Sequence, residues 1–441
     1  MAQTQSQTLP APAPALSQGR IFQYWLPLAA SWLLMSFEGP FANSVIARLS
    51  EPERMLAAFG IVTAISLAIE SPVVPLLSTS TALARSRGNF IKLRRFTLIL
   101  LSLTTLIHAL ISWTPLFEVV AVRWMGTPTA IVPSVRLGMR IMIFWSAAIA
   151  WRRFTQGILI RYGQAGYVGK GTLVRLLTMA CVAVGTALLT NLPGIAVGAL
   201  ALSSGVIAEA AYAHIVTRPV IQENFFADIA QSGQPDLNYR DLIKFHTPLA
   251  ASVFLFLFSR PIVSAALARS PNPEIALAAW PIVSNLLFIA RAPAVALPEV
   301  VIALAEEKDS RAQLQRFSLY VGIVSSLVLI LISFTPLSTF YFQKLIGIDA
   351  SLAAVAVAGS KVAFILPLVT AAIMLYRGFM TASKHTFSIT ISMIANISLL
   401  LLSLIIGVLI RAPGVMIGAA ALTLSFLAEF GTIYLTSRRI P

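Results

Sequence analysis

Long apolar stretches separated by short polar segments run along almost the whole chain. Many of them reach about 20 residues, the length that a helix needs to cross the hydrocarbon core of a bilayer. The pattern predicts twelve membrane-spanning helices, at residues 21–48, 54–84, 95–117, 131–161, 170–190, 194–217, 241–269, 275–305, 316–335, 351–383, 386–410 and 413–436. The alternating ten-residue strands of a transmembrane barrel are missing from the pattern.

The first six predicted helices and the last six are copies of each other. PLAAS occurs at 27–31 and at 248–252, and FTLILLSLTTLIHALISWTPL (96–116) matches FSLYVGIVSSLVLILISFTPL (317–337) at the same shift of 221 residues. PGIAVGALALSSGVIAEA (193–210) matches PGVMIGAAALTLSFLAEF (413–430) at a shift of 220. Because each half holds an even number of helices, both copies insert the same way up, so an axis along the membrane normal relates them.

The expected protein is therefore an all-α polytopic membrane protein with two six-helix bundles related by a parallel repeat. We expect a disordered cytoplasmic tail at 1–20, an N-terminal lobe at 21–218, a cytoplasmic linker at 219–240 and a C-terminal lobe at 241–441. A site at the interface of the lobes is typical of such duplicated transporters.

Composition supports a membrane protein, with 57% hydrophobic and only 11% charged residues. The net charge of +15 would favour nucleic-acid binding in a soluble protein. Here the predicted inner segments carry 17 basic residues and the outer ones 6, an asymmetry that sets orientation in a bilayer. We therefore expect a multi-pass protein of the plasma or inner membrane, with both termini and the linker in the cytoplasm and no nucleic-acid partner.

Charged residues also lie inside the predicted helices, where each costs about 3 kcal/mol or more at the bilayer centre. They are Arg136, Arg140, Arg152, Arg153, Arg175, Arg260, Arg291, Lys361 and Arg377, with Glu38, Glu70, Glu209, Glu299 and Glu429. Arg136, Arg175 and Lys361 are near helix ends and are expected to snorkel. Glu209 and Glu429 match in the repeat, which favours a shared structural role. The positive surplus favours an anionic ligand, which arginine binds through two donors at once.

Matching positions in the two halves carry different charges. Glu38 matches Ser259, beside Arg260; Glu70 matches Arg291; and Gln156 matches Arg377. A site at the lobe interface would diverge in this way, because the two lobes present complementary halves to one ligand. The alternative is a set of buried Glu–Arg pairs that lock the lobes together.

Prolines follow two of these positions, in Gly39-Pro40 and in Arg260-Pro261, and Pro72 and Pro293 repeat the pattern in the second helix of each half. A proline removes a backbone hydrogen bond and kinks a helix. Such backbone is tolerated in a membrane only where protein or a water-filled cavity covers it. We therefore expect Glu38 and Arg260 to lie beside a cavity.

Four short segments resemble the progressive ankylosis protein family, within the multidrug/oligosaccharidyl-lipid/polysaccharide (MOP) exporter superfamily. They are YWLPL (24–28), AW…GILI across 150–160, SRPIV (259–263) and IGID (346–349). The resemblance spans most of the chain and implies outward transport of ATP, citrate or pyrophosphate-related anions. It places Arg260 in a family motif. Glu38 is similar to the first-helix acid that multidrug (MATE) exporters of the superfamily use for cation coupling.

Two transport functions follow. The first is export of organic anions by alternating access, with substrate bound by Arg260, Arg291, Arg377, Arg152, Arg153 and Gln156, and with Glu38 and Glu70 as counter-ions or coupling groups. The second is a multidrug exporter coupled to H⁺ or Na⁺ through Glu38. A flippase for a lipid-linked anion and a passive channel stay open.

Enzymatic activity is not expected, because the chain has no His-Glu-x-x-His, no Gly-x-Ser-x-Gly and no membrane Asp pair. We expect a monomer surrounded by lipid, with no cofactor and no metal.

Overall fold

The computed structural model describes residues 16–226, 237–305, 307, 310–383 and 385–438. The predicted tail at 1–20 and the predicted linker at 219–240 fall partly outside this range. What is described of them at 18–20, 219–226 and 239–240 is helical, so the ordered lobes extend further into both segments than the apolar pattern indicates.

The described chain is built of helices and contains no strand. The first half contains α1 (Gln18–Ser36), α2 (Glu38–Ile46), α3 (Pro52–Glu70), α4 (Leu76–Leu83), α5 (Arg87–Trp113), α6 (Val132–Ile141), α7 (Trp145–Arg161), α8 (Gly166–Leu189) and α9 (Gly194–Ile221). The second half contains α10 (Tyr239–Leu267), α11 (Pro273–Val295), α12 (Leu297–Leu304), α13 (Ser310–Phe334), α14 (Leu337–Thr339), α15 (Ala350–Val362), α16 (Leu366–Ala382), α17 (Thr386–Leu409) and α18 (Gly414–Ser437).

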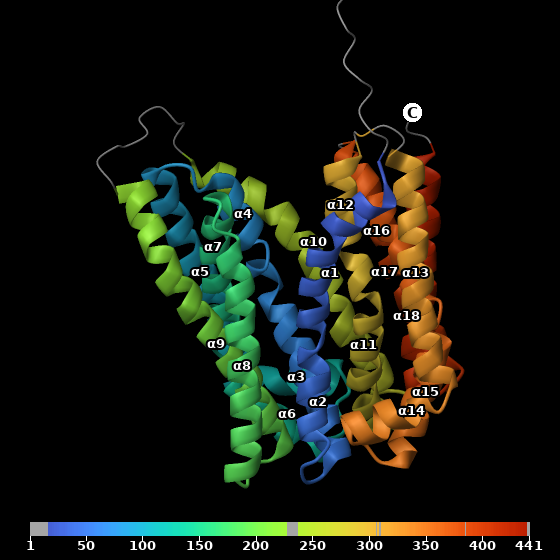
Figure 1. Ribbon diagram of the computed structural model, residues 1–441. Coiled ribbons are helices and arrows are strands. Elements are labelled where there is room, and N and C mark those ends of the chain that lie inside the picture. Colours follow the sequence, from blue (N-terminus) through green and yellow to red (C-terminus); the bar gives the residue numbers. More distant parts are fainter. Residues whose placement is uncertain (1–15, 227–236, 306, 308–309, 384, 439–441) are drawn as a thin grey trace, which may run out of the picture.

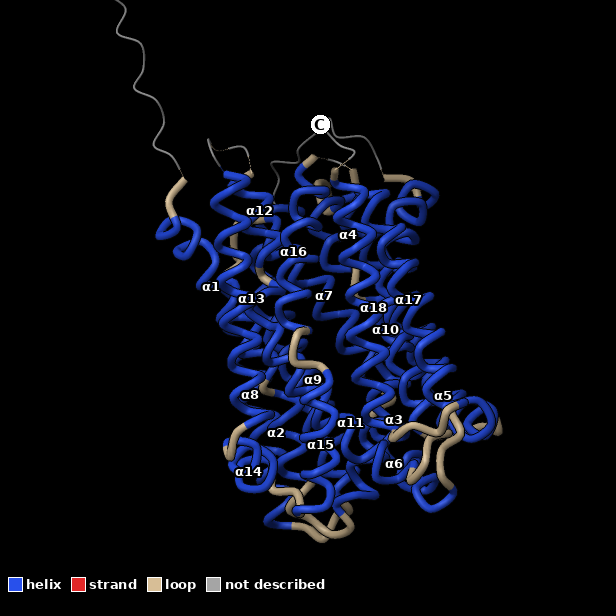
Figure 2. Tube along the Cα trace, turned by 90° about the vertical axis from the view of Figure 1, so that its right-hand side faces the viewer, coloured by secondary structure: helices blue, strands red, loops and turns tan. Residues whose placement is uncertain are grey.

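Ten helical segments in the described chain are long and apolar enough to span a bilayer, and the pair α15–α16, bent by 44°, makes an eleventh. The twelfth expected helix, at 21–48, consists of α1 and α2. The prediction of an all-α polytopic fold is confirmed. The long helices run along one common direction, with their connections gathered at the two ends (Figure 2).

Several expected helices are divided, mostly near prolines. The break at Phe37 between α1 and α2 lies just before Pro40, which cannot donate to the carbonyl of Ser36. Pro72 lies in a 3-10 turn after α3. The predicted kink at Pro261 is not a break, because α10 continues from Tyr239 to Leu267. The break between α6 and α7 has no proline, and nothing in the sequence indicated it.

The two halves meet at equivalent residues. Gly60 of α3 and Pro281 of α11 are 221 positions apart, and a Cβ on Gly60 would come within 2.7 Å of the Pro281 Cγ atom. Only glycine permits this approach of the two helices. These equivalent residues therefore lie at the contact between the two halves. The main apolar core contains residues of both halves.

The leading helix of each half crosses to the opposite lobe, as the positions of α1 and α10 in Figure 1 show. The Trp25 Nε1 atom of α1 donates to the carbonyl of Pro293, at 2.9 Å. At the equivalent place, the His246 Nε2 atom of α10 donates to the carbonyl of Pro72, also at 2.9 Å. Each lobe is thus completed by the first half of the other lobe's leading helix.

Candidate functional site

A cavity of about 370 Å³ lies between the two lobes. Four arginines and two glutamates line it: Arg175, Arg260, Arg291, Arg377, Glu38 and Glu429. Between these groups lie apolar and aromatic side chains, among them Trp145, Trp280, Phe288 and Phe426. The cavity therefore combines an apolar wall with a surplus of two positive charges.

Both glutamates of the cavity wall are paired within their own lobes. Glu38 accepts a hydrogen bond from the Arg175 Nη2 atom. Glu429 accepts one from the Arg377 Nη2 atom and another, of 2.8 Å, from the Asn396 Nδ2 atom. The negative charges of the cavity are therefore already compensated, and the surplus positive charge lies elsewhere.

Arg260 and Arg291 supply that surplus. Neither forms an ion pair within the described part of the chain. The Arg291 Nε atom donates to the carbonyl of Leu287 at 3.1 Å, and its guanidinium carbon lies 5.1 Å from the centre of the Phe426 ring. Arg260 is exposed to the cavity. Both come from the second lobe, so this lobe presents cationic donors to the interface.

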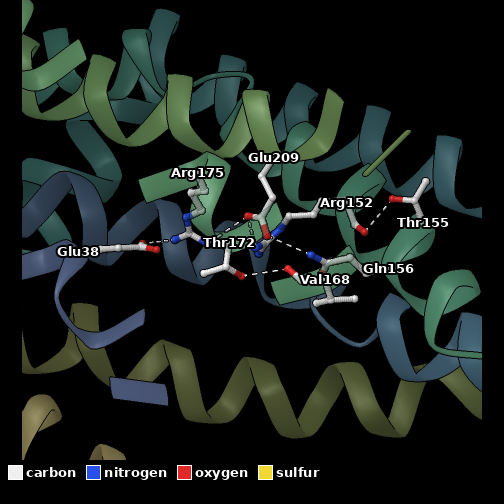
Figure 3. Close-up of polar contacts among 8 residues, drawn as sticks. All are labelled: Glu38, Arg152, Thr155, Gln156, Val168, Thr172, Arg175 and Glu209. Carbon is white, nitrogen blue, oxygen red and sulfur yellow. Dashed lines mark hydrogen bonds and ion pairs between the residues drawn. The ribbon is translucent and has the colours of Figure 1, made fainter. Parts of the chain in front are cut away.

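A second charged cluster lies behind the cavity in the first lobe (Figure 3). Its centre is Glu209, which is fully buried. Glu209 accepts hydrogen bonds from the Arg152 Nη1 atom at 2.6 Å and from the Gln156 Nε2 atom at 3.0 Å, and the Arg175 Nη1 atom lies 3.6 Å away. Arg175 thus joins this cluster to Glu38 in the cavity wall.

The predicted site residues divide into two groups. Arg260, Arg291, Arg377 and Glu38 line the cavity, whereas Arg152, Arg153 and Gln156 do not. Arg152 and Gln156 belong to the Glu209 cluster. Glu70 does not line the cavity itself. It accepts a hydrogen bond from the Nε1 atom of Trp145, and Trp145 lines the cavity.

The alternative of buried Glu–Arg pairs that lock the lobes together is not what the described residues of the cavity wall form. Glu38 pairs with Arg175 inside the first lobe, and Glu429 pairs with Arg377 inside the second. Charges near the cavity therefore stabilise each lobe separately and leave the lobes free of a central ionic bridge.

Arg175 is a residue of the cavity wall that the sequence did not predict as part of the site. It was expected to snorkel out of the membrane, but its side chain is only 11% exposed and faces two carboxylates. The repeat contained the signal, since Arg175 matches Asn396 at a shift of 221, and both lie against the matching glutamates Glu209 and Glu429.

The fold is that of MATE transporters of the MOP superfamily. The chain is similar to the MATE multidrug transporter DinF-BH, with 13% identity, a TM-score of 0.71 and coverage of 100% of this chain and 98% of that one. It is also similar to the inward-facing form of a MATE family multidrug resistance transporter, with 14% identity, a TM-score of 0.66 and coverage of 95% and 99%.

A third similar structure is a MOP superfamily transporter from Pyrococcus furiosus, described by the words "reverse polarity of binding pocket suggests different function". It has 15% identity, a TM-score of 0.61 and coverage of 97% of this chain and 98% of that one. No protein-family model matches the chain, and no curated protein sequence matches it.

Proposed function

We propose that this protein exports organic anions, such as phosphorylated or polycarboxylate metabolites, by alternating access between its two lobes. The observation that carries the proposal is the position of Arg260 and Arg291, two arginines of the cavity wall that form no ion pair in the described part of the chain. A guanidinium that faces a cavity in a low-dielectric surrounding binds carboxylate or phosphate through two parallel hydrogen bonds.

The two paired arginines of the cavity extend this site. Arg175 and Arg377 are held by Glu38 and Glu429, and each keeps further N–H donors. An anion that enters between the lobes would exchange these intralobe pairs for contacts with substrate oxygens. Arg260, Arg291 and Arg377 are the proposed substrate ligands, and Glu38 is the proposed counter-ion.

Arg152 and Gln156 receive a supporting role in this proposal, whereas no described contact assigns one to Arg153. The buried Glu209 is held by Arg152 and Gln156, and it lies within 3.6 Å of Arg175. The cluster therefore fixes the side chain of Arg175 from behind, and Glu70 orients Trp145 in the same way.

The similarity to the Pyrococcus furiosus transporter supports a function that differs from multidrug export within this fold. That protein is described by the words "reverse polarity of binding pocket suggests different function". The four arginines and two glutamates of this cavity give a net positive pocket, which favours an anion.

A cation-coupled multidrug exporter is the second candidate. Glu38 favours it, because this glutamate lines the cavity, is 7% exposed and has one carboxylate oxygen without a hydrogen-bond partner. Such a carboxylate binds H⁺ or Na⁺ when a neighbouring arginine moves away. Under this second function, Arg260 is only an internal positive charge and not a ligand.

The two functions can be distinguished in cells that express the protein. ATP, pyrophosphate and citrate are measured in the medium, and efflux of a cationic dye is measured in parallel. Wild type is compared with Arg260→Ala and Glu38→Gln, at matched amounts of protein in the membrane. Anion export that Arg260→Ala abolishes supports the proposal.

Dye efflux that needs Glu38, without anion release, selects the multidrug exporter instead. Arg54→Ala is the matched control. Arg54 is an exposed arginine outside the cavity, and it pairs with the neighbouring Glu51 at 3.4 Å.

A further inference from the structure

Helix α2 of the first lobe ends on the side of the molecule remote from the C-terminus (Figure 1). Arg48 follows this helix and connects the two lobes. Its Nη2 atom donates to the carbonyls of Lys344 and Leu345, both at 2.9 Å, and its Nη1 atom donates to the carbonyl of Ile346 at 2.8 Å. These three carbonyls close the π-helical turn Phe340–Ile346 of the second lobe.

Arg269, 221 positions later, makes the same connection in the opposite direction. It follows α10 of the second lobe. Its Nη2 atom donates to the carbonyls of Arg123 and Trp124, at 3.4 and 2.6 Å, and its Nη1 atom donates to the carbonyl of Met125 at 3.1 Å. Two of these acceptors belong to the π-helical turn Glu118–Trp124 of the first lobe, and Met125 caps it.

The chemistry of the two contacts explains why arginine occupies both positions. The last carbonyls of a helical turn lack donors within that turn and carry partial negative charge. One planar guanidinium spans three of them, which the single nitrogen of lysine does not. Each arginine is also held by its own helix, through the carbonyls of Ser44 at 2.6 Å and Ala265 at 2.7 Å.

A glycine follows each turn and leaves room for the arginine. Gly126 and Gly347 have φ angles of +72° and +90°. A Cβ on Gly347 would lie 2.8 Å from the Arg48 Nη1 atom, and one on Gly126 would lie 3.2 Å from the Arg269 Nη1 atom. Each glycine thus allows the backbone to turn with a positive φ angle and leaves space for the guanidinium.

We propose that Arg48 and Arg269 form a two-point latch that closes the lobes at this end and that must release for the lobes to part there. The latch is the reciprocal contact between equivalent residues of the two lobes, made through backbone carbonyls. It contrasts with the cavity, whose described ion pairs all stay within one lobe. The proposal rests on movement of the lobes and not on the identity of the substrate.

Electron–electron distance measurements on spin-labelled protein in nanodiscs test the latch. The labels are attached at Asn191→Cys and Ile410→Cys, exposed residues in one loop of each lobe, in a Cys181→Ala background that removes the free cysteine. No substrate is added, so failure of the anion proposal would leave the result interpretable.

We expect a short-distance population in the latched protein. Arg48→Lys and Arg269→Lys should each add a population at longer distance, and the double variant should increase it further. Arg54→Lys should leave the distribution unchanged, since Arg54 binds Glu51 of its own lobe.

Gly347→Ala is a second test that keeps both arginines. Its methyl group would displace the Arg48 guanidinium, so it should also populate the longer distance. Unchanged distributions in both the double lysine variant and Gly347→Ala would overturn the latch.

Discussion

Arg175 in α8 and Asn396 in α17 occupy equivalent positions in the two lobes, and each lies against the glutamate of its own lobe. The Arg175 Nη1 atom is 3.6 Å from the Glu209 Oε2 atom, and the Asn396 Nδ2 atom donates to the Glu429 Oε2 atom at 2.8 Å. The duplicated fold has thus kept the carboxylate and changed its partner.

The other partner has changed in the opposite sense. Gln156 donates to Glu209, whereas Arg377, its equivalent, donates to Glu429. In the first lobe the amide is Gln156 of α7 and the guanidinium is Arg175 of α8. In the second lobe the equivalent positions carry the guanidinium of Arg377 and the amide of Asn396. Each buried carboxylate stays paired in this exchange: Glu209 has Arg175 of α8 in addition to Arg152 of α7, and Glu429 has Arg377 of α16.

Arg377→Gln tests this exchange through stability. The substitution leaves Glu429, which is 3% exposed, without a guanidinium, and breaking a buried pair in this way costs about 3–5 kcal/mol. Thermal unfolding of the purified protein should move to lower temperature. Adding Asn396→Arg to this variant places a guanidinium at the position equivalent to Arg175 and should recover most of the loss. A double variant no more stable than Arg377→Gln alone would contradict the exchange.

Glu209→Gln should be among the most destabilising single changes near the centre of the molecule. Arg152 is 4% exposed and would keep a buried charge without its 2.6 Å partner. We expect a loss of about 3–5 kcal/mol in the free energy of unfolding. Glu307→Gln is the control, because Glu307 pairs with Arg20 at the surface, where an ion pair contributes about 0–1 kcal/mol. Equal melting temperatures for the two variants would show that the cluster is not structural.

Glu429→Gln should increase the affinity for an anion. Its carboxylate competes with substrate for Arg377, and its removal frees that guanidinium toward the cavity. A freed charge-assisted hydrogen bond is worth about 1.5–3 kcal/mol, or a roughly tenfold or greater change in affinity. Binding of labelled citrate or ATP measures the effect. Glu118→Gln, which unpairs Arg136 away from the cavity, should change nothing.

The crossings of α1 and α10 predict that two further substitutions, one in each helix, lower the stability. Trp25→Phe removes the hydrogen bond to Pro293, and His246→Phe removes the one to Pro72. Each loss should cost about 1 kcal/mol of stability or somewhat more, since a carbonyl is left unpaired. His246→Phe also strands the Thr79 hydroxyl, which lies 2.9 Å from the His246 Nδ1 atom, so it should be the more damaging. Melting curves with no change for either variant would remove the crossings as a stabilising feature.

Much of the fold could be predicted because its signals are local or periodic. Apolar runs of bilayer length give the spans, and the shift of 221 residues gives the two lobes. Helix breaks were predictable where proline removes a donor, as at Pro40, but not between α6 and α7, where none is present. The crossing of α1 to the opposite lobe depends on tertiary contacts of Trp25 that no local pattern contains.

The charged residues of the site could be predicted from the sequence, but the residues with which they pair could be predicted less well. The repeat identified Arg260, Arg291, Arg377 and Glu38, all of which line the cavity. It did not separate these from Arg152, because helix position alone does not tell which face of α7 points at the cavity and which at α9. The snorkelling predicted for Arg175 was wrong. The prediction followed from its position near a helix end, whereas carboxylates on two other helices hold its side chain inside.

The contacts of Arg48 and Arg269, each the last residue of a predicted helix, could not be predicted from the charge pattern. Their acceptors are backbone carbonyls, and such acceptors leave no signature in the side-chain sequence. Only the geometry of the two π-helical turns reveals them.

Equilibrium binding of a labelled organic anion to the purified protein, wild type against Arg260→Gln, tests most directly whether Arg260 is a substrate ligand. We expect saturable binding of citrate, ATP or pyrophosphate to wild type. The substitution should weaken it about 10- to 100-fold, because one charge-assisted contact is lost. A cationic dye in the same assay should not compete. Binding of the dye that depends on Glu38, together with anion binding that is absent or indifferent to Arg260, would contradict this role of Arg260.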